Sequence, residues 1–351
     1  MAILSGLPVH SNGRGRASLG DLSLSDGLSD GFGRRIDYLR LSLTDRCNFR
    51  CIYCMPHGGL PFTPHEEIVS YEDMLRLCGI MASLGISRFK VTGGEPLCRK
   101  GAAGFIRNLA ALPGAAEVTL TTNGSLLEPY CEQLAGSGLR AVTFSCDALD
   151  PRVFARIART DISLAAVLRA MERAADLGLR VKINTVPLQG HNDGQLVPLA
   201  SFALERGYHI RFIELMPVGL GKTLRGLPQE EVFAVMEREF GRLEPATEKT
   251  GNGPAVVYSA RGYPGRIGFI AALSGRFCGA CNRMRLTSTG FLKSCLCHSL
   301  GADLRAPLRQ GASDEDVRRI ILETVANKPA GHTFSFTGKE KNVFYMNTVG
   351  G

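Results

Sequence analysis

The octapeptide Cys47-Asn48-Phe49-Arg50-Cys51-Ile52-Tyr53-Cys54 carries three cysteines, with three and two residues between them, just after the β-rich run Tyr38–Leu43. A structural zinc site needs four protein ligands, usually from paired Cys-x-x-Cys elements. An iron–sulfur cubane held by three thiolates leaves one iron free for another ligand. The spacing therefore favours a short loop around one face of a [4Fe-4S] cluster. A zinc site completed by His57 is the alternative.

Short β-rich runs alternate with helix-length amphipathic segments around this octapeptide. Repeated β-α alternation predicts an α/β fold with a parallel sheet, here a curved, partial (βα)6 barrel. The predicted strands are Tyr38–Leu43, Arg88–Thr92, Val118–Thr121, Ala141–Ser145, Arg180–Val186 and Ile210–Leu215. The predicted helices are Tyr71–Leu84, Gly104–Leu112, Leu126–Ala135, Leu164–Leu177 and Gln195–Glu205.

Three segments are expected along the 351 residues. Residues 1–33 are rich in Gly and Ser without an apolar period and predict a flexible N-terminal tail, with an organellar transit peptide as the alternative. Residues 34–219 hold the predicted barrel. Residues 220–351 contain an acidic helix near Glu230–Phe240 and a second cysteine cluster, and predict a C-terminal domain.

Composition excludes several classes of protein. Hydrophobic residues make up 44% and charged residues 21%, which excludes a disordered or fibrous chain. The chain has no apolar run long enough to span a membrane, so no membrane partner is expected. The net charge of +8 favours an anionic partner. Eleven cysteines without a secretory leader favour metal ligands in a reducing compartment, hence a cytoplasmic location.

Polar groups gather where predicted strands end, and cations lie inside two of the strands. Gly93-Gly94-Glu95-Pro96 follows one strand, and its glycines would let the backbone approach a ligand, although a simple turn is the alternative. Strand alternation places Lys182 and Asn184 on one face. A buried strand cation such as Lys182 or Arg211 needs an anion, either an internal carboxylate such as Glu214 or an anionic ligand.

The second cysteine cluster also has three members, Cys278, Cys281 and Cys295. A zinc site with Cys297 as fourth ligand is the alternative, although its Cys-x-Cys spacing is tight for zinc. The segment between Cys281 and Cys295 contains Arg283 and Arg285, whose guanidinium groups share a face in an extended segment. Two such groups suit phosphate oxygens, which accept paired hydrogen bonds.

The first cysteine motif, placed after the first strand of a partial barrel, resembles the radical S-adenosylmethionine (SAM) superfamily. From residue 34 onward the chain resembles one family in it, the GTP 3′,8-cyclases of molybdenum cofactor biosynthesis. The matching segments are Leu39–Ser42 through Pro56, Thr92–Leu97, Thr121–Gly124, Asp147–Asp150, Arg211–Met216, Phe277–Leu286 and Gly350-Gly351.

This resemblance implies two [4Fe-4S] clusters, with Cys47, Cys51 and Cys54 as ligands of one and Cys278, Cys281 and Cys295 as ligands of the other. It implies that a SAM-derived radical removes the ribose 3′ hydrogen of GTP and that C3′ then attacks guanine C8. The implied SAM contacts are Tyr53, Gly94, Thr122, Ser145 and Met216. The implied GTP contacts are Arg40, Arg99, Lys182, Arg211, Arg283 and Arg285. The terminal Gly350 and Gly351 would reach into the active site.

The resemblance also implies partners. Cyclic pyranopterin monophosphate synthase would act next, and a reductant such as flavodoxin or ferredoxin would supply electrons. The oligomeric state is open, with a homodimer as one option, and no nucleic-acid partner is expected. Two alternatives remain: a radical SAM enzyme acting on a peptide, and a zinc-dependent nucleic-acid-binding module, which the positive charge permits.

Overall fold

The six predicted strands form one curved parallel sheet in the computed structural model, which describes residues 27–247, 251–275, 277–336 and 345–350. Each strand begins and ends within two residues of the prediction, so the expected α/β partial barrel is confirmed. The strands are β1 (Tyr38–Ser42), β2 (Arg88–Thr92), β3 (Glu117–Thr122), β4 (Ala141–Ser145), β5 (Arg180–Thr185) and β6 (His209–Ile213).

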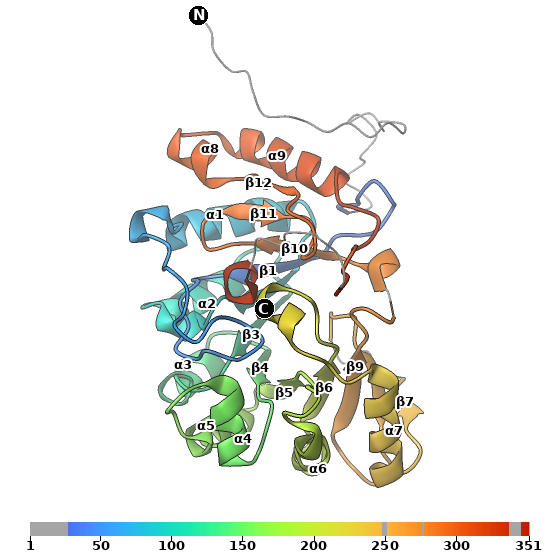
Figure 1. Ribbon diagram of the computed structural model, residues 1–351. Helices are drawn as coiled ribbons and strands as arrows, with labels where there is room; N and C mark the ends of the chain where they lie inside the picture. Colours follow the sequence, from blue (N-terminus) through green and yellow to red (C-terminus); the bar gives the residue numbers. More distant parts are fainter. Residues whose placement is uncertain (1–26, 248–250, 276, 337–344, 351) are drawn as a thin grey trace, which may run out of the picture.

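Helices follow the strands and cover the outer face of the sheet (Figure 1). They are α1 (Tyr71–Ser83), α2 (Ala102–Ala110), α3 (Cys131–Ala135), α4 (Pro151–Ala158), α5 (Leu164–Asp176) and α6 (Leu196–Glu205). The predicted helix Leu126–Ala135 is shorter than expected, because a 3-10 turn at Glu128–Tyr130 precedes α3. The prediction missed α4, which the side chain of Asp150 caps by accepting from the backbone N–H groups of Arg152 and Val153.

Strand alternation separates an apolar outer face from a polar inner face. In β2, Phe89 and Val91 are fully buried in the core between sheet and helices. Lys90 and Thr92 lie on the other face, toward the inside of the barrel. The same alternation in the other strands gives the barrel a polar interior.

The C-terminal segment continues this sheet at both edges. Strand β9 (Arg266–Ile270) pairs parallel to β6, and β10 (Arg283–Leu286) pairs parallel to β1 with Arg285 opposite Arg40. Antiparallel strands then extend each edge, giving 12 strands in the order β12-β11-β10-β1-β2-β3-β4-β5-β6-β9-β8-β7. These outer strands are β7 (Glu244–Pro245), β8 (Val256–Ser259), β11 (Phe291–Lys293) and β12 (Gly301–Asp303). The predicted C-terminal domain therefore shares its sheet with the barrel.

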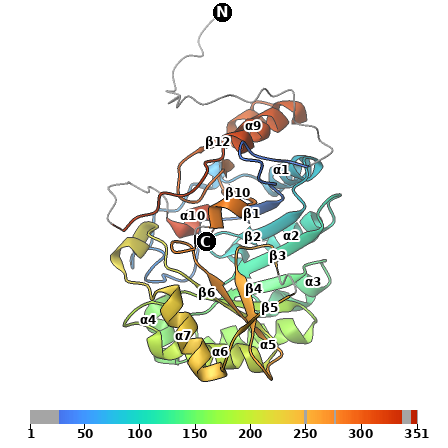
Figure 2. The same cartoon turned by 90° about the vertical axis from the view of Figure 1, so that its right-hand side faces the viewer.

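The C-terminal segment also adds helices. They are α7 (Gln229–Phe240), α8 (Arg305–Arg309), α9 (Asp314–Ala326) and α10 (Met346–Val349). Figure 2 shows α9 at one end of the molecule next to α1, and α10 near its middle beside β10 and β1. In the described part of the chain, no helix is both long enough and apolar enough to cross a membrane.

The described end of the predicted N-terminal tail packs against the core. Leu28 is 5% exposed and joins the main apolar cluster. Ser29 forms a β-bridge with Arg35, and the buried carboxylate of Asp30 pairs with Arg34 at 2.6 Å. The remainder of the predicted tail, residues 1–26, lies outside the described residues.

Candidate active site

Both cysteine sets line one cavity of about 310 Å³ inside the curved sheet. The first set lies on the loop after β1, and the second comes from the segments before β10 and after β11. Because β10 pairs parallel to β1 and antiparallel to β11, the two sets lie at opposite ends of these paired strands and face the same cavity. The thiols that line the cavity are those of Cys47, Cys51, Cys54, Cys278, Cys281 and Cys295.

Helix α4, which the sequence analysis missed, supports the first cysteine loop. The backbone N–H groups of Arg50 and Ile52 donate to carbonyls at the end of α4, each at 2.9 Å. Phe49 is buried and packs edge-on against Phe154 of α4 at 5.9 Å between ring centroids. Helix α4 therefore fixes this loop, whose thiols line the cavity.

The first set offers three sulfur ligands on one short loop. Three thiolates on a cubane bind three separate irons and leave the fourth iron open. Burial raises the pKa of Cys47 to about 12 and that of Cys54 to about 11. Such thiols become thiolates when a metal supplies positive charge, so this donor set fits an iron–sulfur cluster.

The second set sits in a more cationic environment. Burial alone would raise the pKa of Cys281, but the charges of Arg283 and Lys328, together with hydrogen bonds from Arg283, lower it to about 7. Arg283 donates to the sulfur of Cys281 at 3.6 Å. Cys297 is buried with its sulfur near Thr333 and does not line the cavity, so it is not placed with the other three.

Glycines at the tip of β2 permit close contact with the first cysteine loop. A Cβ at Gly94 would overlap the carbonyl group of Arg46, and a Cβ at Gly93 would lie 2.6 Å from the carbonyl oxygen of Thr44. The next residue, Glu95, is buried and accepts from the hydroxyl of Thr122 at 2.8 Å. Burial raises the pKa of this carboxyl to about 7. Glu95 thereby ties the tip of β2 to the tip of β3.

The residues expected to contact SAM all line the cavity. Tyr53 donates its hydroxyl to the carboxylate of Asp147 at 2.7 Å, and Asp147 also accepts from the backbone N–H of Val186 at 2.8 Å. Burial raises the pKa of Asp147 to about 6. The sequence analysis placed Asp147 in the matching segment Asp147–Asp150 but assigned it no role. The expected SAM contacts on the cavity wall are Tyr53, Gly94, Thr122, Ser145 and Met216.

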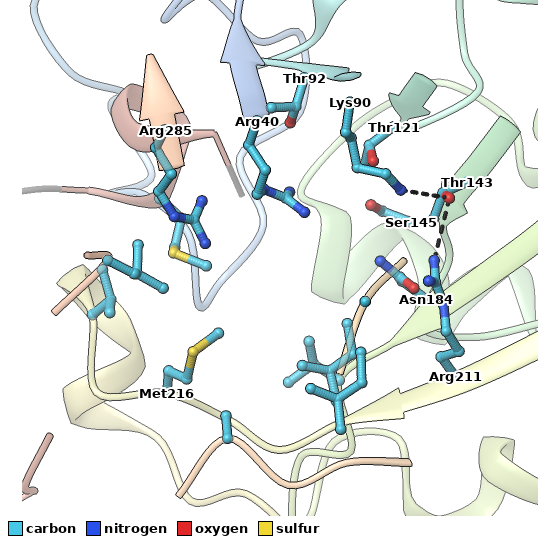
Figure 3. A pocket seen from close by; sticks show the side chains of 18 of the residues that line it. Arg40, Lys90, Thr92, Thr121, Thr143, Ser145, Asn184, Arg211, Met216 and Arg285 are labelled. Atoms are coloured by element: carbon cyan, nitrogen blue, oxygen red, sulfur yellow. Dashed lines mark hydrogen bonds between the residues drawn. The ribbon is translucent and has the colours of Figure 1, made fainter. Parts of the chain in front are cut away.

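Cationic side chains of β10, β1, β2, β5 and β6 form a layer across the cavity (Figure 3). Lys90 and Arg211 both donate to the hydroxyl of Thr143, at 3.1 and 3.2 Å, and the Nε of Arg211 is buried without a hydrogen-bond partner among the described residues. The layer comprises Arg40, Lys90, Lys182, Arg211, Arg283 and Arg285.

Burial of these charged side chains costs free energy, which an anionic ligand would offset. Burial, followed by the charge of Arg211, lowers the pKa of Lys182 to about 8. Burial also lowers the pKa of Arg211 to about 10 and that of Lys90 well below its ordinary value. Glu214, considered above as an internal partner, accepts instead from the backbone of Leu273 and Ser274. The layer is therefore preorganised for an anionic ligand.

The lining of the cavity differs from the expected substrate contacts at Arg99 and Lys90. Arg99 does not line the cavity, because its guanidinium donates to the carbonyls of Leu43 and Val69 and stacks on the ring of Tyr71, 4.0 Å from the ring centroid. Lys90 does line it and was missed. The alternation that placed Lys182 on an inner face applies equally to Lys90 in β2, so the signal was present in the sequence.

The end of the chain enters the cation layer. The carbonyl oxygen of Gly350 accepts from Arg285 at 2.5 Å and from Arg40 at 3.2 Å. Gly350 has a φ of 73°, and a Cβ there would lie 2.7 Å from the methyl carbon of Thr92. Gly351 lies outside the described residues.

Comparison with known proteins agrees with this geometry. Residues 41–203 match the model of the Radical SAM superfamily, and residues 208–334 match the model named Molybdenum Cofactor Synthesis C. A GTP 3′,8-cyclase of Clostridium perfringens strain 13 is 40% identical over 324 residues, covering 92% of this chain and 100% of the relative. The chain belongs to the GTP 3′,8-cyclase family. A member of this family from Heliobacterium modesticaldum is 43% identical over 328 residues, covering 92% of this chain and 99% of the relative.

The fold is shared more widely than the family. SuiB of Streptococcus suis, solved with its precursor peptide SuiA, gives a TM-score of 0.60 at 14% identity, covering 92% of this chain and 74% of that one. At this identity the likeness concerns the fold alone. Membership in the GTP 3′,8-cyclase family makes the chain a radical SAM enzyme of molybdenum cofactor biosynthesis, and SAM with a [4Fe-4S] cluster belongs to that chemistry.

Proposed function

We propose that this chain binds GTP in the cation layer and converts it to (8S)-3′,8-cyclo-7,8-dihydroguanosine 5′-triphosphate, the first step of molybdenum cofactor biosynthesis. The observation that carries the proposal is the layer itself. The six Lys and Arg side chains of this layer line the cavity that also holds the two sets of three cysteines. A triphosphate would place negative charge beside these buried cations, and guanidinium groups match phosphate oxygens.

Cys47, Cys51 and Cys54 would hold the first cluster, and the tips of β2 to β4 would hold SAM. When bound, the cluster and SAM supply the radical that removes the ribose 3′ hydrogen. The chain's own part is positioning. Glu95 fixes the tip that carries Thr122, and Asp147 fixes the hydroxyl of Tyr53, so the SAM contacts are held before a ligand arrives.

Cys278, Cys281 and Cys295 would hold a second [4Fe-4S] cluster at the other end of the paired strands β1 and β10. GTP would lie between the two sets, with its triphosphate on the cation layer and its guanine toward the second set. This orientation would keep the ribose between the two sets. Holding the reacting atoms close in a buried cavity lowers the entropic part of the barrier.

Gly350 is placed to complete this site. Its carbonyl oxygen contacts Arg40 and Arg285, two of the proposed GTP ligands. A chain without side chains fits where a Cβ would meet Thr92. We propose that the tail orients these two guanidinium groups toward GTP and that Gly351 takes part with it.

The remaining partners follow from this reaction. We propose cyclic pyranopterin monophosphate synthase as the enzyme that uses the product, flavodoxin or ferredoxin as the reductant, and a cytoplasmic location; a homodimer stays a prediction. A peptide substrate, the alternative considered from the sequence, has only the shared fold in its favour. The cation layer favours the nucleotide.

The proposal is tested by anaerobic turnover of the reconstituted full-length chain with SAM, GTP and dithionite. We expect 5′-deoxyadenosine and a cyclised nucleotide, both absent from Cys51→Ala. The matched control is Cys78→Ala, because Cys78 is a buried core thiol of α1 outside the cavity, and we expect it to keep product formation. Cleavage of SAM without any change in GTP would contradict the proposal.

A further inference from the structure

A buried lysine outside the proposed substrate ligands lies beside the second cysteine set. Lys328 is 3% exposed, lines the cavity and follows the last residues of α9. Its ammonium donates to the carbonyl of Arg283 at 2.8 Å and to the carbonyl of Ser294. Arg283 lies two residues after Cys281, and Ser294 directly precedes Cys295. One ammonium therefore joins the two segments that carry two of the three thiols.

The charge of Lys328 has no carboxylate partner among the described residues. Burial lowers its pKa, and the charges of Cys281 and Cys295, as thiolates, act in the opposite direction. A buried ammonium bonded only to neutral carbonyls is unfavourable unless an anion lies close by. With a cluster bound, the thiolates of the second set would supply that anion.

A second cation holds the segment around Lys328 in place. Arg34 donates to the carbonyl of Cys278 at 2.8 Å, and also to those of Pro329 at 2.7 Å and Ala330 at 2.9 Å. Its own charge is balanced by the buried carboxylate of Asp30. Arg34 thus joins the residues after Lys328 to the backbone of Cys278, the third cysteine of the set, so the ammonium is fixed beside the thiols before any cluster is present.

We propose that Lys328 is a positioning residue of the second cluster site, which fixes the segments carrying Cys281 and Cys295 and balances the charge of their thiolates. The inference rests on the second cluster of the proposed function. A positive charge and hydrogen bonds close to a cluster raise its reduction potential, because they favour the more negative, reduced state. Lys328 therefore keeps this cluster's potential higher than the thiolates alone would.

The test uses the full-length chain with Cys51→Ala, so that the second cluster alone gives the iron–sulfur signal. Lys328→Gln removes the charge and Lys328→Arg keeps it. As a control, Arg319→Gln removes an exposed charge from α9, the helix that precedes Lys328. Iron content, circular dichroism and a redox titration followed by electron paramagnetic resonance are measured on each. We expect Lys328→Gln to have a lower midpoint potential or to lose its roughly four irons, and Lys328→Arg and Arg319→Gln to match the parent.

The outcomes separate this inference from the proposed function. A parent with Cys51→Ala that holds no iron–sulfur cluster would overturn the second cluster, and Lys328's role with it. A parent that holds the cluster, with Lys328→Gln at the same potential and iron content, would overturn the role of Lys328 alone. An equal loss in Lys328→Gln and Lys328→Arg would show that the charge is not what matters and would also overturn it.

Discussion

Replacing Gly350 with alanine adds one methyl group at the point where the chain enters the cation layer. Gly350 has a φ of 73°, in the left-handed region, and its added Cβ would lie 2.7 Å from the methyl carbon of Thr92. A left-handed backbone costs a non-glycine residue about 1–2 kcal/mol. The equilibrium constant for seating the tail should therefore fall by about 5- to 30-fold from the backbone alone. The clash with Thr92 adds to this.

The predicted consequence is selective. Gly350→Ala changes no cysteine, so both clusters should assemble normally, with iron content and SAM binding as in the parent. Cyclisation of GTP should fall, because the Gly350 carbonyl no longer fixes Arg40 and Arg285. The assay measures cyclised nucleotide formed per 5′-deoxyadenosine under anaerobic conditions, and this ratio should drop in the variant.

Two further variants sharpen the assay. Gly104→Ala is the matched glycine control, because Gly104 lies inside α2 with open space where its Cβ would stand. Thr92→Ser combined with Gly350→Ala removes the methyl group that clashes with the added Cβ, so it should recover part of the activity. The cost of the left-handed backbone at residue 350 remains in this double variant. Cyclisation at the parent rate in Gly350→Ala would refute a role for the seated tail.

Three other predictions follow from the cation layer. Lys90→Met should raise the melting temperature of the ligand-free chain, because it removes a buried ammonium whose one hydrogen-bond partner among the described residues is Thr143. The same variant should weaken GTP binding about 10- to 100-fold. Arg283→Ala should weaken GTP binding by a similar factor of about 10 to 100 in calorimetry, with the irons retained. The charged form of Lys182 is disfavoured in the free cavity, where its pKa is about 8, so GTP binding should take up a proton and weaken as the pH rises through 8. Over the same pH range the ligand-free chain should gain stability, because Lys182 in the unfolded chain keeps its proton up to a higher pH than in the folded chain. Calorimetry in buffers of different ionisation enthalpy measures the proton uptake on GTP binding, and thermal melts measure the change in stability.

The barrel could be predicted from the sequence because its signals are local. Each strand of the barrel is a short apolar or alternating run between turn residues, and a helix-length amphipathic segment follows most of them. Helix α4 escaped prediction because it has only the residues Pro151–Ala158, although Asp150 and Pro151 form a standard helix start. The parallel pairing of β10 with β1 had no local signal, since it joins residues near 40 to residues near 285.

The site was predictable where the spacing of the residues itself specifies the chemistry. The two cysteine patterns and the alternation around Lys182 needed no structure. Arg99 was placed by resemblance, yet it follows a 3-10 turn rather than lying in a strand, so alternation does not direct it into the barrel. Lys328 had no sequence signal, because its role depends on contacts with residues 34 to 45 positions away along the chain and on burial.

Transfer of one hydrogen atom tests the central claim most directly. GTP carrying deuterium at the ribose 3′ carbon is supplied to the reconstituted full-length chain with SAM and dithionite, and the 5′-deoxyadenosine is analysed by mass spectrometry. The account predicts one deuterium in 5′-deoxyadenosine, together with a cyclised nucleotide that has lost it. Deuterium-free 5′-deoxyadenosine, formed while the nucleotide keeps its label, would contradict the account.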